Sequence, residues 1–429
     1  MKPTLELSAP ASKSMTQRAL VLAALAGGPG RIRGPLDCDD ARYLSELIRA
    51  LGGAVHQGDA TWQVIPPPRP LVPPAAAVFL GNAGTAVRFG ACWSLLLGSG
   101  SLRLDGDAHM RRRPLGPLVD ALAHLGVDAA YDATPGCPPV ALTAPDRKGS
   151  PEATLALDGS LSSQYASGLM MVAPLLPRGL ELRLTGAVVS RPYLDMTRAM
   201  MRRAGGPEPT WSDPGHGPTL TVPPSGPYPA TEHTVEPDWS GAAFLLAGGL
   251  IAGRDVTVPG LLPPADSLQG DAAFGAMMTR LRAAQTGDPP LSFDLTDAPD
   301  LIAPLTAAAV FAPCPVVIEG AAHTRIKESD RVAVLATQLS RLGFVIATRD
   351  DGLRIEPTSP KARLRSTSDV PVTLDPDHDH RMAMAFGLVG LRVPLRVAHP
   401  ECVSKSFPTF WSQLETLRAA MPPDAVSSG

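Results

Sequence analysis

The stretch Gly81-Asn82-Ala83-Gly84-Thr85-Ala86-Val87-Arg88 follows an apolar run at residues 78–80, which predicts a short buried strand, and leads into a predicted helix at residues 86–97. Small residues before a helix N-terminus let backbone N–H groups approach an anion, and Thr85 and Arg88 add side-chain donors. The stretch therefore favours binding of a phosphate or a carboxylate. It lacks the Gly-Lys-Ser/Thr ending of a nucleotide P-loop, which argues against an ATPase. An ordinary strand-to-helix turn accounts for such a loop equally well.

The length and composition of the chain predict a globular protein of two or more domains. It has 429 residues, of which 44% are hydrophobic and 18% charged. The net charge of −3 argues against general nucleic-acid binding. No apolar run approaches the length of a membrane span and residues 1–5 do not resemble a signal peptide, so we expect a cytoplasmic protein. The cysteines show no paired metal spacing, so we expect reduced thiols and no bound metal.

A weak internal repeat is visible where predicted helices end. Apolar residues at helical spacing are followed by a glycine suited to a C-cap, usually after a basic residue in the last turn, at residues 47–52, 122–126, 201–205 and 339–343. Weaker counterparts lie at residues 278–281 and 414–418, and short β-type runs follow at 343–347 and 353–355. The spacing of roughly 60–80 residues suits a small α/β subdomain. We therefore predict repeated α/β units, about six in all.

Other loops before predicted helices combine cations with hydroxyl groups or amides. Residues 325–331, for example, are expected to open a helix that runs to Leu342. A solvated turn, an N-cap or a helical face with ion pairs explains each loop taken alone. Taken together, the cations favour a small polyanionic substrate, because each charge-assisted bond contributes roughly 1.5–3 kcal/mol. They are Lys13, Arg18, Arg88, Arg113, Lys327, Arg331, Arg381 and Lys405, and the carboxylates suited to proton transfer among them are Asp300 and Glu328.

Three motifs in order carry a resemblance to a known family. They are Gly81–Arg88, Lys327-Glu328-x-Asp330-Arg331 and Asp379-His380-Arg381-x-Ala383-Met384. With them the chain resembles the 3-phosphoshikimate 1-carboxyvinyltransferases, or EPSP synthases, from residue 12 to residue 408. The resemblance implies an α/β fold of two similar domains, each of three βαβαββ units in an inside-out α/β barrel, with the active site in the interdomain cleft. The implied domains are residues 12–235 on the shikimate 3-phosphate side, and residues 1–11 with 236–429 on the side of the catalytic acid/base groups and phosphoenolpyruvate; residues 421–429 are expected to form a flexible tail.

The resemblance also implies an activity and its partners. The family transfers the enolpyruvyl group of phosphoenolpyruvate to the 5-hydroxyl of shikimate 3-phosphate and releases phosphate, by addition and elimination through a tetrahedral intermediate. This reaction belongs to the shikimate pathway, which supplies chorismate and the aromatic amino acids. It needs no metal or organic cofactor. The implied inhibitor is glyphosate, and we expect a monomer that binds neither nucleic acid nor membrane.

Residue roles are carried over from the family by position. Asp300 is the implied base at the 5-hydroxyl, Glu328 the acid/base at the methylene carbon, and Lys13 a partner of both substrates; coupled titration leaves the proton's owner open. Implied contacts to shikimate 3-phosphate are Lys13, Ser14, Arg18, Ser162, Ser163, Gln164, Ser190, Tyr193, Asp300, His323 and Lys327. Implied contacts to phosphoenolpyruvate are Lys13, Asn82, Gly84, Thr85, Arg113, Gln164, Arg331, His380, Arg381 and Lys405. Arg113 is chosen over its basic neighbours because the family's arginine directly precedes a proline, here Pro114.

Two positions depart from the family pattern. Phe89 stands where proline is frequent, and His323 stands where asparagine is frequent, although histidine still donates a hydrogen bond. One alternative is a UDP-N-acetylglucosamine enolpyruvyl transferase, which would be expected to carry a Lys-Asn pair near the N-terminus and a reactive cysteine on a mobile loop. Here the pair is Lys13-Ser14, and Cys137 lies in a Pro-Gly turn. The other alternative is an inactive anion-binding homologue, against which the retained carboxylates and lysines argue.

Overall fold

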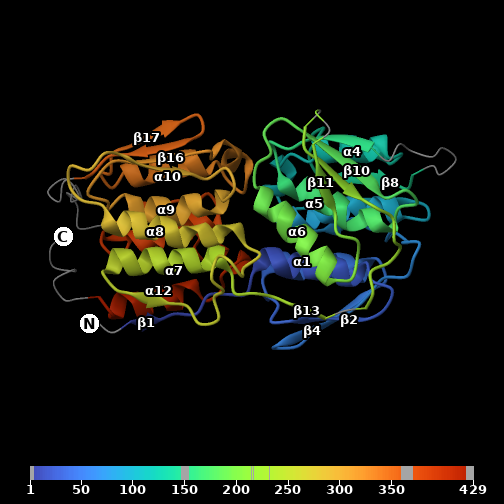
Figure 1. The fold of residues 1–429 in the computed structure, drawn as a ribbon, viewed down its shortest axis with the longest axis horizontal. Helices are drawn as coiled ribbons and strands as arrows, with labels where there is room; N and C mark the ends of the chain where they lie inside the picture. The colour runs from blue at the N-terminus through green and yellow to red at the C-terminus, as the bar shows by residue number, and fades with distance from the viewer. Residues whose placement is uncertain are drawn as a thin grey trace. The chain divides into compact units, whose positions relative to one another are not determined.

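The computed structural model describes residues 4–145, 154–213, 215, 217–230, 232–358 and 371–421 (Figure 1). They divide into two compact units, unit 1 with residues 1–12 and 236–429 and unit 2 with residues 13–235, each within the described ranges. Ser12, which we expected to open the first domain, belongs to unit 1. Its backbone N–H donates to the carbonyl oxygen of Glu236 at 2.7 Å, which ties it to the segment that re-enters that unit.

Unit 2 contains three four-stranded sheets and the helices that connect their strands. Its strands are β2 (Gly30–Arg33), β3 (Ala54–Gln57), β4 (Thr61–Ile65), β5 (Val78–Phe79), β6 (Ser101–Asp105), β7 (Asp128–Tyr131), β8 (Val140–Thr143), β9 (Thr154–Asp158), β10 (Leu180–Thr185), β11 (Thr210–Ser212), β12 (Thr219–Val222) and β13 (Glu232–Thr234). Its α-helices are α1 (Lys13–Ala24), α2 (Asp39–Ala50), α3 (Gly84–Cys92), α4 (Gly116–His124), α5 (Ser163–Val172) and α6 (Arg191–Arg203). Short 3₁₀ turns are η1 (Trp93–Leu96), η2 (Met110–Arg112) and η3 (Ala173–Leu175).

The three sheets of unit 2 share one topology. Their orders are β13-β2-β4-β3, β5-β6-β8-β7 and β9-β10-β12-β11, and in each the first pair is parallel and the other two pairs antiparallel. Because a parallel pair needs a crossover and an antiparallel pair needs only a hairpin, each sheet is built from a βαβαββ repeat. In the first repeat the leading strand is β13, which is the last strand of the unit in sequence order.

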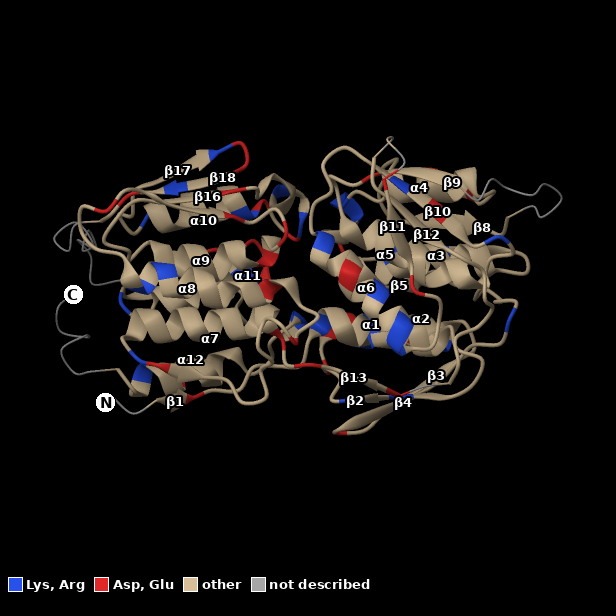
Figure 2. Ribbon diagram, in the orientation of Figure 1, with Lys and Arg blue, Asp and Glu red and all other residues tan. Residues whose placement is uncertain are grey.

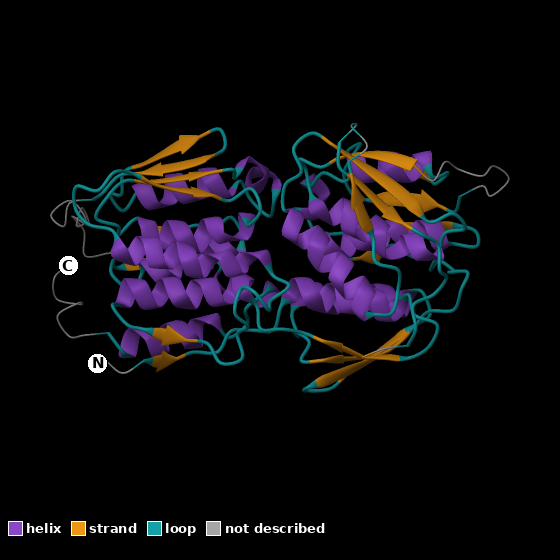
Figure 3. Cartoon of the chain, viewed as in Figure 1, coloured by secondary structure: helices purple, strands orange, loops and turns teal. Residues whose placement is uncertain are grey.

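The helices of unit 2 lie between the sheet that contains β10 and β11 and the sheet that contains β13, β2 and β4 (Figures 1 and 3). Every residue of α3 is buried, whereas β4 and β9 alternate between buried and exposed positions. A helix without a solvated face lies in the interior, and an alternating strand packs one face on the core and exposes the other. The predicted inside-out α/β arrangement is therefore present in this unit.

Unit 1 repeats this plan, with fewer strands among its described residues. Its strands are β1 (Leu5–Glu6), β14 (Val256–Thr257), β15 (Leu291–Asp294), β16 (Val316–Glu319), β17 (Ile346–Arg349), β18 (Gly352–Ile355), β19 (Val372–Leu374) and β20 (Leu395–Val397). Its α-helices are α7 (Trp239–Ala252), α8 (Phe274–Ala283), α9 (Ile302–Ala309), α10 (Arg331–Ser340), α11 (His380–Val389) and α12 (Phe410–Ala419). Its 3₁₀ turns are η4 (Gly270–Ala273), η5 (Pro299–Leu301), η6 (Ala322–Ile326) and η7 (Pro400–Lys405).

Within the described residues, one sheet of unit 1 has the complete βαβαββ pattern that we expected. The sheet β15-β16-β18-β17 has the full pattern, but β1-β14 and β19-β20 are parallel pairs alone within the described residues. Residues 284–290, which link α8 to β15, contain no strand. All ten residues of α11 are buried, so the interior is again helical.

The predicted helix ends agree with the structure at four places. Gly52, Gly126, Gly205 and Gly343 follow α2, α4, α6 and α10 with φ between +74° and +90°. This left-handed conformation favours glycine because a side chain would clash with the backbone.

Three local predictions were wrong. The strand expected at 343–347 begins only at Ile346, and the helix expected from residue 325 begins at Arg331, because Asp330 caps it by accepting the Ala333 N–H at 3.0 Å. Met421, placed in the expected tail, is buried in the core of unit 1. Residues 422–429, the rest of that expected tail, lie outside the described residues.

Candidate active site

The loop that opens α3 holds an arginine against a glycine. Arg113 Nη1 donates to Asn82 Oδ1 at 3.1 Å, and the Arg113 side chain is almost fully buried. A Cβ added at Gly84 would lie 2.7 Å from Arg113 Nη2. Because Gly84 has no side chain, there is room for this guanidinium. Asn82, Gly84 and Arg113, all predicted to contact phosphoenolpyruvate, therefore lie together.

A second contact joins α3 to α5. Arg88 Nη1 donates to Gln164 Oε1 at 2.6 Å, and Gln164 Nε2 donates to Thr85 Oγ1 at 3.1 Å. The α5 helix begins here because Ser162 Oγ accepts the Gln164 N–H at 3.3 Å as an N-cap. The neighbouring Ser163 is the first residue of the helix. Arg88, which we did not include among the predicted contact residues, orients Gln164.

The guanidinium of Arg18 is hydrogen-bonded to side-chain hydroxyl groups and backbone carbonyl oxygens of unit 2. It donates to Thr197 Oγ1 at 2.8 Å, to Ser167 Oγ at 3.3 Å, and to the carbonyl oxygens of Ser14 and Tyr193. Burial lowers the pKa of Arg18 to about 10, so it stays protonated at neutral pH. These bonds connect α1, α5 and α6 and bring three of the predicted shikimate 3-phosphate residues together. Thr197 and Ser167 were missed because hydroxyl groups inside helices carry no distinctive sequence signal.

Phe89 has a structural role in this arrangement. Its buried ring lies under Arg18, with the guanidinium carbon 5.7 Å from the ring centroid. A cation above an aromatic face is stabilised by the ring quadrupole. The departure from proline at this position therefore supplies a support for Arg18.

Lys13 and Ser190 stand at the start of helices. Lys13 Nζ lies 3.3 Å from Asp40 Oδ2, and Gln17 Nε2 donates to the same oxygen at 3.3 Å. Asp40 is buried near the start of α2 and was not predicted. Ser190 precedes α6 in a left-handed conformation with φ of 56°.

Unit 1 contains a buried cluster of charged side chains centred on Arg331. Arg331 Nη1 donates to Asp300 Oδ1 at 2.8 Å, Nη2 to Glu328 Oε2 at 3.0 Å, and Nε to Asp379 Oδ2 at 2.8 Å. Burial opposes its charge, but the three carboxylates outweigh this effect and raise the pKa of Arg331 well above its usual range. Its side chain is 1% exposed. All three guanidinium nitrogens are therefore committed to acids.

Two further cations complete this cluster. Arg381 Nη2 donates to Asp300 Oδ2 at 2.7 Å, and Lys405 Nζ donates to Glu328 Oε1 at 3.0 Å. Each of the two predicted proton-transfer carboxylates is thus bound by Arg331 and by one cation of its own. The cluster lies where α10 and α11 begin, in the part of unit 1 where Figure 2 shows acidic and basic residues close together. We call Asp300, Glu328, Arg331, Asp379, Arg381 and Lys405 the charged cluster.

The contribution of Asp379 was not predicted, although its motif was. Asp379 caps α11 by accepting the Arg381 N–H at 2.9 Å, and it also accepts from Ser329 Oγ at 3.2 Å. Its i+1 neighbour His380 is fully buried, with Nδ1 3.7 Å from Asp379 Oδ1. The capping pattern was the available signal, since aspartate is a preferred N-cap residue.

His323 and Lys327 flank the charged cluster on η6 and the turn that follows. Burial, then the positive charge of Lys327, lowers the pKa of His323 to about 4, so the imidazole is neutral at pH 7. A neutral ring has one N–H donor and one acceptor nitrogen. The ring can therefore both donate and accept a hydrogen bond, as an asparagine side chain at the same position also could.

This pKa leads to a prediction about stability. The unfolded imidazole takes up a proton near its ordinary pKa of 6.5, but the folded one only near 4, so folding stability falls as the pH is lowered through that window. The loss is on the order of 3 kcal/mol for one such group. We expect His323→Asn to lose less stability than the wild type between these pH values in urea unfolding. Equal losses of stability would show that His323 titrates normally. Burial also lowers the pKa of His233 to about 4, but His233 is present in both proteins and its contribution cancels in the comparison.

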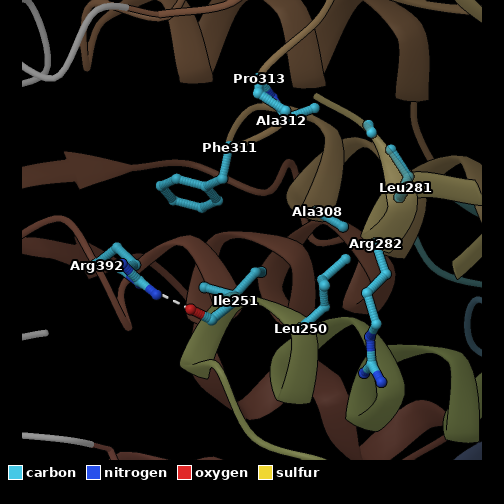
Figure 4. Close-up of a pocket in the computed structure, with 10 residues that line it drawn as sticks. Leu250, Ile251, Leu281, Arg282, Ala308, Phe311, Ala312, Pro313 and Arg392 are labelled. Carbon is cyan, nitrogen blue, oxygen red and sulfur yellow. Dashed lines mark hydrogen bonds between the residues drawn. The ribbon is translucent and has the colours of Figure 1, made fainter. Parts of the chain in front are cut away.

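A cavity elsewhere in unit 1 contains none of the predicted site residues. Its volume is about 230 Å³, and it lies where α7, α8 and α9 end (Figure 4). Its lining is mostly apolar, with Arg282 and Arg392 at the edge; Arg392 Nε donates to the Ile251 carbonyl oxygen at 2.7 Å. The residues predicted for the site therefore lie among the polar groups described above and do not line this cavity.

Comparisons with known proteins agree with this picture. The family model described as EPSP synthase (3-phosphoshikimate 1-carboxyvinyltransferase) matches residues 4–414. Similar proteins with the name 3-phosphoshikimate 1-carboxyvinyltransferase include one from Rhizobium leguminosarum bv. trifolii, 37% identical over 95% of this chain and 93% of the relative. Another, from Pseudomonas syringae pv. syringae, is 37% identical over 96% of this chain and 94% of the relative.

A solved structure is similar in fold. The EPSP synthase from Acinetobacter baumannii superimposes with a TM-score of 0.72 at 23% identity, covering 96% of this chain and 95% of that one. None of the helices among the described residues is long and apolar enough to cross a membrane.

Proposed function

The chain belongs to the EPSP synthase family, and on that premise we propose that the charged cluster of unit 1 transfers the protons of its reaction. Family membership makes the chain an enzyme, a 3-phosphoshikimate 1-carboxyvinyltransferase of the shikimate pathway. Its reaction is the transfer of an enolpyruvyl group from phosphoenolpyruvate to the 5-hydroxyl of shikimate 3-phosphate. The observation that carries the assignment is that Asp300 and Glu328 share Arg331 while each has a second cation of its own.

The reaction requires a base at the 5-hydroxyl group and an acid at C3 of phosphoenolpyruvate. In the addition, the 5-hydroxyl oxygen bonds to C2 of phosphoenolpyruvate and loses its proton, while C3 gains a proton and becomes a methyl group. In the elimination, the methyl group returns a proton, the C2–O bond to phosphate breaks, and phosphate leaves with its electron pair. We assign the first proton to Asp300 and the proton at C3 to Glu328, with Lys13 as a partner of both substrates. Because Asp300 and Glu328 are bound to one guanidinium, a proton taken by one changes the affinity of the other for protons.

The polar groups of unit 2 are suited to a phosphorylated substrate. We assign shikimate 3-phosphate to Lys13, Ser14, Arg18, Ser162, Ser163, Gln164, Ser190 and Tyr193, together with Asp300, His323 and Lys327 of unit 1. Arg18 acts mainly by holding α1, α5 and α6, because most of its donors are bonded to protein oxygens. Phosphoenolpyruvate is assigned to Lys13, Asn82, Gly84, Thr85, Arg113 and Gln164, together with Arg331, His380, Arg381 and Lys405.

The activity is tested by phosphate release from phosphoenolpyruvate. We expect release with shikimate 3-phosphate as acceptor and none with UDP-N-acetylglucosamine. Release with the UDP-sugar alone would favour the alternative transferase, and release with neither would leave an anion-binding homologue. We further propose a cytoplasmic monomer, which sedimentation of the purified enzyme would test as to its oligomeric state.

Arg113 offers a test of the phosphoenolpyruvate assignment with a matched neighbour. We expect Arg113→Ala to raise the KM for phosphoenolpyruvate about tenfold or more, since it removes a charge-assisted contact. Arg111→Ala is the control, because the Arg111 side chain is half exposed and its guanidinium is paired with Asp105. A larger effect from Arg111→Ala would overturn the assignment.

Gly84 offers a test of inhibition by glyphosate. We propose that glyphosate competes with phosphoenolpyruvate and that Gly84→Ala weakens it about 10- to 100-fold. The added methyl group would displace the Arg113 guanidinium, so the KM for phosphoenolpyruvate should rise as well. Gly275→Ala in α8 is the control, since its added Cβ would meet only one ordinary contact, at 3.9 Å. A wild-type enzyme indifferent to glyphosate would contradict the proposal.

A further inference from the structure

A buried carboxyl group close to the charged cluster has no part in the assignments above. Asp271 belongs to η4 and is 2% exposed. Ser240 Oγ, in the first turn of α7, donates a short hydrogen bond to its Oδ2. Burial of a carboxyl group costs free energy unless its surroundings compensate for it. The burial of the Asp271 carboxyl group therefore needs a structural or functional explanation.

The loop before Asp271 is fastened to the chain that precedes α7. Gln269 Nε2 donates to the Pro237 carbonyl oxygen at 2.8 Å, and Gln269 Oε1 accepts the Trp239 N–H at 3.0 Å. Ser267 Oγ donates to Glu236 Oε2 at 2.8 Å. These bonds hold η4 against the start of α7, so that Asp271 and Ser240 meet in one geometry.

Three charged groups interact with Asp271, and two of them, Asp300 and Arg381, belong to the active-site assignment. Asp238 precedes α7, Asp300 lies in η5, which packs against α7, and Arg381 opens α11. Arg381 is bonded to Asp300 at 2.7 Å, so both carboxylates interact with one guanidinium. Burial, and then the charge of Asp300, raise the pKa of Asp271 to about 7, while the Ser240 bond and Arg381 act in the opposite direction.

We propose that Asp271 is a positioning residue that acts through Asp300, adding a second negative charge near that carboxylate and strengthening its hold on the proton of the attacking hydroxyl. The inference rests on the proposed function for the role of Asp300. When Asp271 is neutral, Asp300 is a weaker base, because the two arginines bonded to it favour its ionised form. When Asp271 ionises, repulsion makes Asp300 more ready to take a proton. The two carboxyl groups therefore titrate as a coupled pair.

The coupling is tested first without turnover. Infrared difference spectra of the protonated carboxyl stretch, recorded between about pH 5 and about pH 9, should show one buried group that titrates near neutral pH. Asp271→Asn should abolish this titration, and Ser240→Ala should move its midpoint upward, because the lost hydrogen bond favoured the ionised form. Asp300→Asn should move the midpoint down by about one pH unit or more. An unchanged midpoint in Asp300→Asn, or a titration that persists in Asp271→Asn, would overturn the proposal.

The pH dependence of kcat is the second test. The ratio of wild-type to Asp271→Asn kcat cancels the ionisation of the substrates. It should rise about three- to tenfold between pH 6 and pH 8, as Asp271 becomes charged. Ser267→Ala loosens the same loop without removing the carboxyl group, so its ratio should stay flat. A flat ratio for Asp271→Asn would mean a purely structural role and would refute the inference. If the wild type releases no phosphate, the proposed function fails while the infrared titration still decides the coupling.

Discussion

Replacing Asp300 with asparagine is expected to lower kcat about 1,000-fold, the range associated with loss of a general base. The amide keeps the shape of the side chain but cannot accept the proton of the attacking hydroxyl. It also loses one of the two charge-assisted acceptors that now bind Arg331 and Arg381 at 2.8 and 2.7 Å. The measurement is single-turnover formation of product with saturating substrates, which separates the chemical step from substrate binding.

The control for this variant is Asp297→Asn. Asp297 lies three residues earlier and is exposed, so we expect activity close to that of the wild type. A kcat for Asp300→Asn within a few-fold of the wild type would remove Asp300 from the proposed mechanism. Glu328 would then be the remaining carboxylate of the charged cluster proposed for proton transfer.

Replacing Arg331 with glutamine is expected to have the largest effect on stability. The change leaves Asp300, Glu328 and Asp379 buried without their shared guanidinium, and breaking a buried ion pair from one side costs about 3–5 kcal/mol. Activity should fall as well, because both proposed proton-transfer groups lose their position. Urea unfolding at pH 7 measures the first effect, and phosphate release measures the second.

Arg325→Gln is the matched control for Arg331→Gln. Arg325 pairs with Asp330 at 2.9 Å, but its side chain is 29% exposed. Pairs in contact with water contribute about 0–1 kcal/mol, so this variant should unfold close to the wild type. If the two variants lose similar amounts of unfolding free energy, the burial of Arg331 does not determine how much its ion pairs contribute to stability.

Much of the local structure was predictable because it depends on neighbours in sequence. The glycine that follows each of α2, α4, α6 and α10 indicates a left-handed C-cap, and the strand predicted at residues 353–355 is present as part of β18. The turn at residues 327–330 was mistaken for helix because charged residues at i, i+3 and i+4 also occur on helical faces. In the structure the Asp330 cap starts the helix later, and this turn brings Glu328 to Arg331 and Lys405.

The partners of the charged residues were not predictable in the same way. Asp40, Asp271 and Asp379 are buried beside residues of the proposed site, yet an aspartate in a sequence usually indicates a solvated surface or a cap. Their roles depend on contacts between segments far apart in the chain. Arg381 and Asp300, for example, are 81 residues apart and bonded at 2.7 Å.

The sequence by itself determined the family of this protein, its repeated α/β units and the cations and carboxylates that we propose for a polyanion site. The stretch Gly81–Arg88 already indicated an anion, because a glycine-rich helix start exposes N–H groups whatever surrounds it. Only the tertiary structure decided how those charges are used. It turned Arg18 towards Thr197, committed Arg331 to three acids and placed Arg113 against Gly84, because pairing depends on distances that packing sets between segments remote in sequence.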